Sequence, residues 1–389
     1  MPQLVEPANL PPVPFNGSTA VFSNTTIRQT LQVSLTAQEI RIRLSNTFGP
    51  NELKVTNVTI SLPASQQVGV SGLQIETLKT VFFNGGPDVE IPSGGLVVSD
   101  PIKFPVKAQS ALMINIYLAE GQQGFSITGH PGSRTTSYLG FGDWTGAENL
   151  TDLSVQSTDH WYFISGVEAW LPSESSGFVV IGDSITDGRG STTNGNDRWP
   201  DLLLARMEKH KQTSNIAILN QAAGGNRILQ DSLGPNVISR LDRDVLAQSG
   251  VQYAMIFEGV NDIGVADSDA ATQAEIEKKL VAAYKQIAAR VHALGIPVFG
   301  ATITPFGSSA TSDYVQPYSS NERERTRQLI NEFIRQSGVF DAVLDFDRVL
   351  RDPDAPSQLL EEYDSGDHLH PNLAGYQALA DYFPLGAFE

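Results

Sequence analysis

The sequence predicts an all-β sandwich or jelly-roll domain followed by a three-layer α/β domain with a parallel sheet. Up to about residue 172, short runs of alternating apolar and polar residues are separated by clusters of Gly, Pro, Asn and Ser. From Phe178 onward, short apolar runs alternate with long segments of helical periodicity. The 389 residues also exceed what one hydrophobic core usually organises. We therefore expect a β domain at 1–172, a polar linker at 173–177 and an α/β domain at 178–389.

The β domain is predicted from strand patterns and from the residues that interrupt them. Runs of β-branched or alternating residues occur at 27–35, 39–44, 55–62, 111–118 and 161–170. Their spacing is typical of a sandwich, and this region contains no long helical pattern. Its three tryptophans, Trp144, Trp161 and Trp170, could form a platform for sugars, but we favour packing in the core or at a domain interface.

The α/β domain is predicted from five apolar strands and the helices between them. The predicted strands are 178–181, 216–219, 253–258, 297–302 and 340–345. The predicted helices are 270–294, 321–338 and 372–382. Such alternation gives a parallel sheet covered by helices on both faces, in which ligands bind outside the carboxyl ends of the strands. Polar residues that follow these strands should therefore lie along one rim of the sheet.

Ser184 follows the first of these strands, in the run Gly182-Asp-Ser-Ile-Thr-Asp-Gly188. The N–H groups at the start of a following helix would favour the negative charge that attack on an ester creates. The alternative is a turn in which Gly, Asp and Ser only shape the backbone. Ser184 is therefore a candidate nucleophile, and the interpretation depends on residues elsewhere in the chain.

A candidate base lies near the C-terminus, in Asp364-Ser-Gly-Asp-His-Leu-His-Pro-Asn372. A serine nucleophile needs a general base, and the base needs a third group that orients it. His370 has both an acid three residues earlier, Asp367, and a proline after it, so we take His370 as base and Asp367 as its partner. His368 and Asp364 are interpreted as structural neighbours, with a metal site built from these Asp and His residues as the alternative.

Two further strand ends supply candidate hydrogen-bond donors. Gly224 and Gly225 follow one short strand, and Gly259-Val-Asn261-Asp262 follows another. A side-chain amide and a backbone N–H directed at one point are what a developing oxyanion requires. Each of these residues alone is more often a turn residue, so the prediction rests on their shared position at strand ends.

Together these segments resemble the four sequence blocks of the SGNH (GDSL-type) hydrolases. The blocks are Gly182-Asp-Ser184, Gly225-Asn226, Gly259-Val-Asn261-Asp262 and Asp367-His-Leu-His370. The resemblance implies a flavodoxin-like three-layer fold with Ser184 as nucleophile, His370 as base and Asp367 as its orienter. It also implies three oxyanion donors, namely the backbone N–H groups of Ser184 and Gly225 and the side-chain amide of Asn261. The N-terminal β domain resembles that of one subgroup of secreted microbial members.

Composition argues against several classes of partner and cofactor. A net charge of −17 is unsuited to nucleic acid, and no apolar run approaches the ~18 residues that span a bilayer. The absence of cysteine removes thiol nucleophiles, disulfides and Cys-ligated zinc, and we expect neither cofactor nor metal. The N-terminal segment lacks the apolar stretch of a signal peptide, although a processed chain would look the same. Sequons at Asn16, Asn24, Asn57 and Asn149 favour a secreted over a cytoplasmic protein.

The sequence therefore predicts a serine esterase that acts through an acyl-enzyme on a small-molecule or polysaccharide ester. Short acyl groups such as acetyl are expected, because the chain has no apolar lid pattern near the site and its acidic charge opposes adsorption to anionic lipid. The segment 304–320 is expected to form a rim loop that selects the leaving group. The alternatives are a lipase for longer acyl chains, a catalytically silent glycan-binding protein and a metallohydrolase. Acyl and alcohol specificity and the oligomeric state are not predicted.

Overall fold

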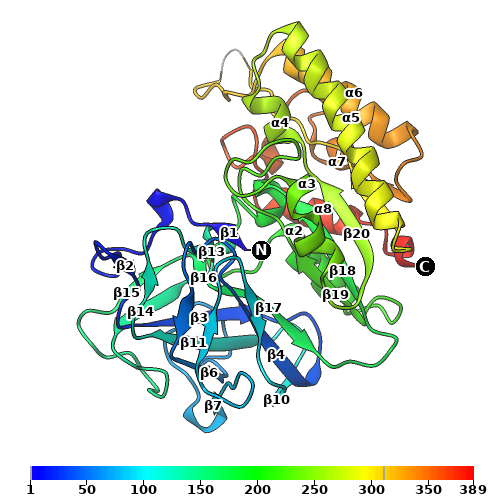
Figure 1. Cartoon of the computed structure of the whole chain (residues 1–389). Coiled ribbons are helices and arrows are strands. Elements are labelled where there is room, and N and C mark those ends of the chain that lie inside the picture. Colours follow the sequence, from blue (N-terminus) through cyan, green and yellow to red (C-terminus); the bar gives the residue numbers. More distant parts are fainter. Residues whose placement is uncertain (1, 310–311) are drawn as a thin grey trace. The chain divides into compact units, whose positions relative to one another are not determined.

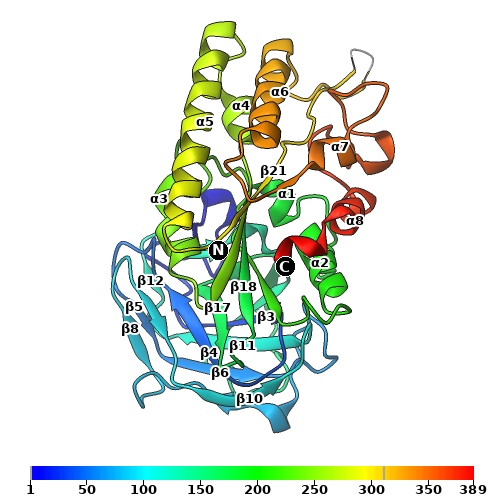
Figure 2. The same cartoon turned by 90° about the vertical axis from the view of Figure 1, so that its right-hand side faces the viewer.

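The computed structural model describes residues 2–309 and 312–389. The chain forms two compact units, which Figure 1 and Figure 2 show from two directions. One unit comprises Met1–Pro172 and Thr193–Gly195, and the other comprises Ser173–Thr192 and Asn196–Glu389. The tip of one loop, Thr193–Gly195, therefore groups with the first unit although it lies within the expected α/β domain.

The first unit is built from antiparallel strands. Six strands pair in the order β15 (Gln156–Thr158), β14 (Ser137–Phe141), β3 (Thr25–Gln32), β11 (Ala111–Leu118), β6 (Asn57–Ser61) and β7 (Lys79–Thr80). A second sheet joins β10 (Ile102–Val106), β4 (Ala37–Ser45) and β17 (Ile164–Ala169), with β9 (Leu96–Val98) also paired to β4. Shorter pairings involve β1 (Gln3–Leu4), β13 (Thr128–His130), β16 (Trp161–Tyr162), β2 (Ala20–Val21), β12 (Gln122–Gln123), β5 (Leu53–Val55) and β8 (Val89–Ile91).

One buried apolar cluster fills this unit. In β4, Ile40, Ile42 and Leu44 point to one face because side chains alternate along a strand, and all three are fully buried. They belong to the same cluster as Ile27 of β3 and Ile114 of β11. Residues of both sheets thus share one core, which is the arrangement of a β-sandwich.

The tryptophans of the first unit differ in their surroundings. Trp144 and Trp161 are partly buried, and each donates its indole N–H to a backbone carbonyl of the same unit. Trp170 is instead 63% exposed, with the guanidinium of Arg41 stacked 4.7 Å from its ring centre. The expectation that all three pack in a core or interface therefore does not hold for Trp170 within the described unit.

The second unit contains a five-stranded parallel sheet. Its strands lie in the order β19 (Ile216–Asn220), β18 (Ser176–Gly182), β20 (Val251–Phe257), β21 (Val298–Ala301) and β22 (Ala342–Leu344). Numbered along the chain, this is the order 2-1-3-4-5 of flavodoxin-like sheets, and the predicted parallel sheet is confirmed. The order reverses at β18, so the carboxyl ends of β18 and β20 are the expected place for a ligand site. Ser184 and Asn261 follow these two strands.

Helices cover both faces of this sheet. The longer ones are α2 (Trp199–Met207), α5 (Ala270–His292), α6 (Asn321–Gln336) and α8 (Leu373–Tyr382). The shorter ones are α1 (Ser184–Asp187), α3 (Val237–Leu241), α4 (Val260–Val265) and α7 (Phe346–Leu350), with a π-helical turn η4 (Asp242–Leu246) after α3. In Figure 2, α5 packs with α6 while α2 packs with α8. None of the helices in the described part of the chain has the length and apolar character of a membrane span.

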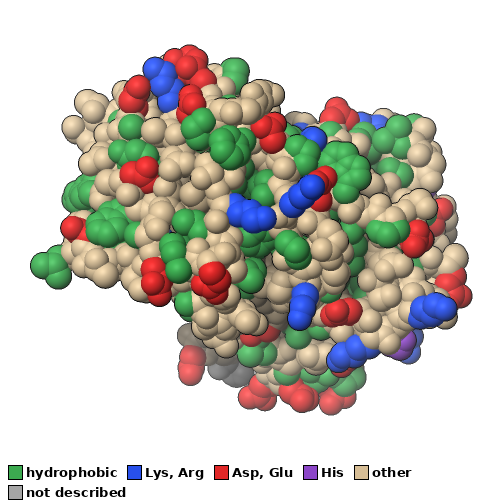
Figure 3. All heavy atoms as spheres, turned by 90° about the horizontal axis from the view of Figure 1, so that it is seen from below, with side chains coloured by type: hydrophobic (Ala, Val, Ile, Leu, Met, Phe, Trp, Pro, Cys, Tyr) green, Lys and Arg blue, Asp and Glu red, His purple; other side chains and the backbone are tan. Residues whose placement is uncertain are grey.

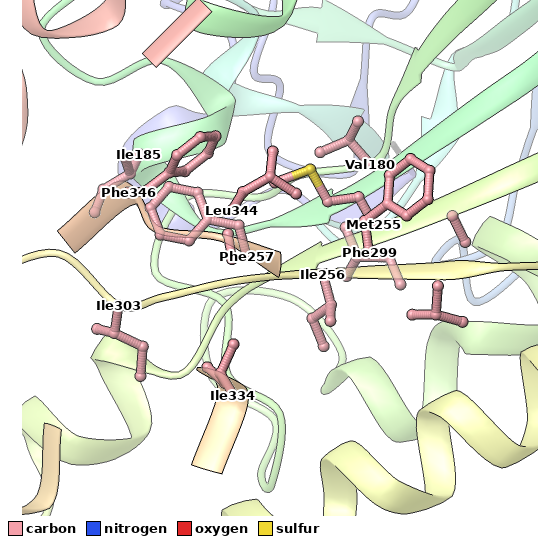
Figure 4. Packing of buried hydrophobic residues seen from close by; sticks show 14 of the residues in the cluster. Val180, Ile185, Met255, Ile256, Phe257, Phe299, Ile303, Ile334, Leu344 and Phe346 are labelled. Carbon is pink, nitrogen blue, oxygen red and sulfur yellow. The ribbon is translucent and has the colours of Figure 1, made fainter. Parts of the chain in front are cut away.

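The core of the second unit follows from the alternation of side chains along its buried strands. Figure 4 shows Ile256 of β20 pointing toward Ile303 and Ile334, while its neighbours Met255 and Phe257 point to the other side of the sheet. All five side chains are at most 2% exposed. Because both faces of β20 are covered, its residues form a continuous apolar run in the sequence.

The expected linker is shorter in the structure. Ser176 and Gly177 already belong to β18, which pairs with β19 from Ser176 onward, so the connection is reduced to 173–175. Backbone hydrogen bonding extends the strand beyond the apolar residues from which it was predicted. On the face drawn in Figure 3, acidic, basic and apolar side chains are interspersed, so the net charge of −17 is not gathered there into one patch.

Candidate active site

Ser184 is presented by a sharp turn between β18 and α1. Asp183 caps α1, because its Oδ1 accepts a hydrogen bond of 2.9 Å from the backbone N–H of Ile185. Gly182 is required because a Cβ at this position would collide with the side chain of Thr186. The predicted helix after Ser184 is only one turn long. Charge stabilisation by a helix dipole is therefore weaker than the sequence suggested, and it depends on individual N–H groups.

The structure brings together the three residues that the sequence predicted for a triad. Oγ of Ser184 lies 2.7 Å from Nε2 of His370, and Nδ1 of His370 lies 2.6 Å from Oδ2 of Asp367. The other carboxylate oxygen of Asp367 accepts the backbone N–H groups of Leu369 (3.1 Å) and His370 (2.8 Å), which fixes the loop. With Nδ1 donating to the carboxylate, Nε2 of His370 can accept the proton of the Ser184 hydroxyl.

The surroundings of Asp367 keep it ionised. Burial alone would raise the pKa of Asp367, but the hydrogen bond and charge of the His370 ring, together with the backbone N–H groups of His370 and Leu369, lower it well below its ordinary value. Arg189 lies nearby, with Nε 3.9 Å from Oδ2 of Asp367, but its side chain is 63% exposed. Solvent screening makes that contact weak, so His370 is the principal partner of Asp367.

A second Asp–His pair lies beside the first. Nδ1 of His368 is 2.6 Å from Oδ2 of Asp364, whose Oδ1 accepts the backbone N–H of His368 at 3.0 Å. His368 has a positive φ of 57°, a left-handed backbone conformation that is uncommon for residues other than glycine. Asp364 and His368 thus pair with each other, while Asp367 and His370 form the other pair. In the described ranges, no group of three or more His, Cys, Asp or Glu side chains is placed to hold a metal ion.

Two backbone N–H groups near the nucleophile make no hydrogen bond within the described residues, those of Ser184 and Gly225. The N–H of the adjacent Gly224 is occupied, because it donates to Oδ2 of Asp187 at 3.0 Å. Gly225 has a φ of +70°, and a Cβ there would press against the side chain of Leu233. Of the two neighbouring glycines, Gly225 is therefore the one whose N–H can meet a ligand.

The Asn261 amide lies at the start of α4 and is 4% exposed. Its Nδ2 donates to the backbone carbonyl of Asn226 at 2.9 Å, and its Oδ1 accepts from the Tyr318 hydroxyl at 3.0 Å. An amide NH₂ has two hydrogens, so one of them remains for a ligand. Because Asn226 directly follows Gly225, this hydrogen bond also ties Asn261 to the turn that carries the Gly225 N–H.

Sequence reasoning missed the side chains that hold this turn. The carboxylate of Asp262 accepts the backbone N–H groups of Ile228 and Leu229, each at 2.9 Å. The buried guanidinium of Arg240 donates to Oδ1 of Asn226 at 3.1 and 2.8 Å. Asp262 belongs to the same sequence block as Asn261, so its role as a buried acceptor of backbone N–H groups could have been inferred from that block. Arg240 lies in a short helix without a distinctive pattern, so the sequence contained no comparable signal for it.

Buried carboxylates lie beneath the site. Burial raises the pKa of Asp183 to about 7, with the charges of Asp262 and Asp187 acting in the same direction. Burial also raises the pKa of Asp262 to about 6, although its hydrogen bonds from backbone N–H groups oppose the change. The pKa of Glu258 is raised well above its ordinary value by burial and by the charge of Asp183, against the charge of Arg240, whose Nη2 lies 3.6 Å from Oε1.

Comparison with known proteins identifies a family model that matches the second unit. The family model described as GDSL-like lipase/acylhydrolase matches residues 178–383. A comparison with curated proteins gave no match. Among solved structures, an acetylxylan esterase named Axe2 from Geobacillus stearothermophilus is 16% identical, covering 56% of this chain and 96% of that one with a TM-score of 0.39. An acetyl xylan esterase named AlAXEase is 19% identical, covering 53% and 96% with a TM-score of 0.39. A GDSL-like lipase from Bacteroides thetaiotaomicron is 15% identical, covering 55% and 88% with a TM-score of 0.39.

Proposed function

Since the chain belongs to the family of GDSL-like lipases and acylhydrolases and is thus a carboxylic ester hydrolase, we propose that it cleaves short-acyl esters through a covalent intermediate on Ser184. The observation that carries this proposal is the hydrogen bond of 2.7 Å between Oγ of Ser184 and Nε2 of His370. The serine hydroxyl stays protonated at neutral pH and is then a weak nucleophile. It needs a base within hydrogen-bond reach that can remove its proton.

In the proposed acylation step, His370 takes the proton of Ser184 as Oγ bonds to the ester carbonyl carbon. The carbonyl oxygen becomes an oxyanion, and the imidazolium is stabilised by the ionised Asp367 on its other side. The tetrahedral intermediate then collapses, the C–O bond to the alcohol breaks, and His370 returns the proton to the leaving oxygen. The alcohol departs and the acyl group stays on Ser184 as an ester.

Deacylation uses the same groups with water in place of serine. His370 removes a proton from water as its oxygen bonds to the acyl carbon, and a second oxyanion forms. Collapse of this intermediate breaks the bond to Oγ, and His370 protonates the serine as the carboxylic acid leaves. The backbone N–H groups of Ser184 and Gly225 and the free N–H of Asn261 would bind the oxyanion in both steps.

The proposed preference for acetyl and similar small groups rests on the surroundings of the site. The helices that begin at Ser184 and directly before Asn261 have only four and six residues, too short to serve as an apolar lid. A long acyl chain gains roughly 0.8 kcal/mol for each methylene only where that methylene is fully buried. A small-molecule or polysaccharide ester with a short acyl group is therefore the substrate class we propose, with a lipase for longer chains as the alternative.

Covalent labelling tests the mechanism directly. An alkyl fluorophosphonate reacts with a serine only where a base and oxyanion donors activate it, so we expect stoichiometric labelling of Ser184 in peptide mass spectrometry. Addition of p-nitrophenyl acetate should slow the labelling by competition. An enzyme that hydrolyses p-nitrophenyl acetate but carries no label on Ser184 would contradict the proposal.

A further inference from the structure

Tyr318 belongs to residues 312–320, the described segment that precedes α6, and it reaches the oxyanion side of the site. The Tyr318 hydroxyl donates a hydrogen bond of 3.0 Å to Oδ1 of Asn261. Burial is the main cause that raises the pKa of Tyr318, and the charge of Asp183 is the second. The hydroxyl therefore keeps its proton at neutral pH and remains a donor. This residue lies outside the four sequence blocks and was not singled out by the sequence.

The amide of Asn261 is held at both of its ends. The carbonyl of Asn226 can only accept, so it faces Nδ2, and the Tyr318 hydroxyl meets Oδ1. A hydrogen bond accepted at the amide oxygen polarises the amide and strengthens the donation from its N–H groups. Tyr318 therefore restricts rotation of the amide plane and also makes its remaining N–H a better donor to an anion.

The local packing is shaped to receive the tyrosine ring. Gly264 lies three residues after Asn261 in α4, and a Cβ at Gly264 would collide with the ring of Tyr318. Glycine weakens a helix interior by roughly 0.5–1 kcal/mol relative to alanine, so its presence here has a packing reason. The ring also meets Phe306 edge-on, with 6.2 Å between the ring centres.

The same segment is anchored to the triad loop by Gln316. Its Nε2 donates to the backbone carbonyl of Asp367 at 2.6 Å, and its Oε1 accepts the backbone N–H of Tyr318 at 3.2 Å. The Gln316 side chain is only 4% exposed. One glutamine thus connects the acid of the triad to the residue that holds Asn261.

From these contacts we infer that Tyr318 is a positioning residue for catalysis, which acts through Asn261 by holding and polarising the amide that binds the oxyanion. The inference rests on the proposed serine mechanism and deepens it. Its consequence is specific: loss of the Tyr318 hydroxyl should weaken binding of the transition state while leaving substrate binding and the native fold intact.

The test compares Tyr318→Phe with Tyr314→Phe. Tyr314 belongs to the same segment, is 48% exposed, and its hydroxyl makes no hydrogen bond within the described residues. For p-nitrophenyl acetate we expect Tyr318→Phe to lower kcat about 3- to 10-fold, the value of one neutral hydrogen bond, with KM within about twofold of wild type. Tyr314→Phe should match wild type. Tyr314→Phe should keep the wild-type melting temperature, and Tyr318→Phe should lower it by no more than a few degrees, the value of one lost hydrogen bond.

A double-mutant cycle with Asn261→Ala separates action through Asn261 from a general structural effect. In the Asn261→Ala background, the further change Tyr318→Phe should alter kcat by less than about twofold, because the amide it acts on is gone. An equal loss in both backgrounds would overturn the inference, as would equal kcat values for Tyr318→Phe and Tyr314→Phe. Fluorophosphonate labelling of wild type at Ser184 is measured in parallel. Absence of that label overturns the serine mechanism and this inference with it, whereas labelling without a Tyr318 effect overturns this inference alone.

Discussion

The hydroxyl of Ser184 lies 2.7 Å from Nε2 of His370, although 186 residues separate the two in the chain. Ser184 follows the first strand of the parallel sheet, and His370 lies in the loop just before the last α-helix, α8. The sheet brings the carboxyl end of β18 to the same rim as this late loop. A contact of this kind has no local sequence cause, so it depends on the fold of the whole second unit.

The first prediction concerns the nucleophile. Ser184→Ala should fold as wild type does, because the Ser184 side chain hydrogen-bonds only to His370 among the described residues. Its hydrolysis of p-nitrophenyl acetate should fall to near the background rate. The small remaining activity would come from the oxyanion donors and from substrate binding. Initial rates and thermal melts on both proteins provide the measurement. A variant with one tenth of the wild-type kcat would exclude Ser184 as nucleophile.

The second prediction compares the two Asp–His pairs. His370→Ala should be about as damaging to kcat as Ser184→Ala, because the two residues act as a unit. His368→Ala is the matched control, since His368 has its own partner, Asp364, at 2.6 Å and makes no hydrogen bond to Ser184 within the described residues. Its kcat should stay within about threefold of wild type.

The same pair of variants tests the metal alternative. Both should be assayed with and without EDTA, and chelation should leave the wild-type rate unchanged. Loss of activity on chelation that returns with added zinc would favour a metallohydrolase. Equal damage from both histidine variants would point to a loop that acts as one structural unit rather than to one base.

The extent of sequence-based prediction can be judged from particular residues. Strands such as β20 were recognisable because burial on both faces leaves a continuous apolar run. Ser184, Asn261 and His370 became candidate site residues because polar residues follow such runs or occur in a short Asp–His motif, and the structure places them at one rim of the sheet. Tyr318 could not be found in this way, since its contact with Asn261 is a hydrogen bond between residues 57 positions apart, for which no spacing rule exists.

Other features depended on local packing that a sequence pattern does not encode. The helix after Ser184 is a single turn that ends at Gly188, whose φ is +98°, and the sequence did not reveal its length. Thr193–Gly195 groups with the first unit, although periodicity assigns it to the second. Arg240 is only 1% exposed in its side chain, and its role depends on carbonyl and carboxylate groups from other elements.

The third prediction is a pH dependence of stability caused by Glu258. Burial raises its pKa, so the native state keeps a proton that the unfolded chain loses above about pH 4.3. The stabilising contribution is therefore fully present below that pH and is lost as the pH rises through the native pKa, with a slope of up to about 1.4 kcal/mol per pH unit. Glutamine does not ionise, so Glu258→Gln removes this pH-dependent loss of stability. The melting temperature of Glu258→Gln, relative to wild type, should thus rise between pH 5 and pH 8.

A control variant is needed for this experiment, and the titration of the other acids with shifted pKa values has to be considered. Glu275→Gln, at an exposed position on α5, should show no such trend. Asp183 and Asp262 act in the same direction as Glu258 and are present in both proteins, so the effect of their own burial cancels in the comparison. Their repulsion of the Glu258 carboxylate does not cancel and is part of the effect that Glu258→Gln removes. Asp367 has a lowered pKa, so its contribution grows as the pH rises through about 4, below the range tested. A constant difference between Glu258→Gln and wild type would show that Glu258 is ionised in the folded protein.

The fourth prediction concerns the length of the acyl chain. We expect kcat/KM for p-nitrophenyl esters of two to twelve carbons to be highest at two to four carbons and to fall steadily beyond. A larger apolar group is favoured only by a deep apolar pocket, and Leu233, which lies against Gly225, is itself 46% exposed. An exposed apolar side chain can contact a small acyl group but cannot surround a long one, so each added methylene should contribute well under the roughly 0.8 kcal/mol of full burial. Leu233→Ser should therefore reduce kcat/KM for the butyrate more than for the acetate, because the longer acyl group has more apolar surface to place against that side chain. A maximum at eight or more carbons would contradict the short-acyl proposal and favour a lipase.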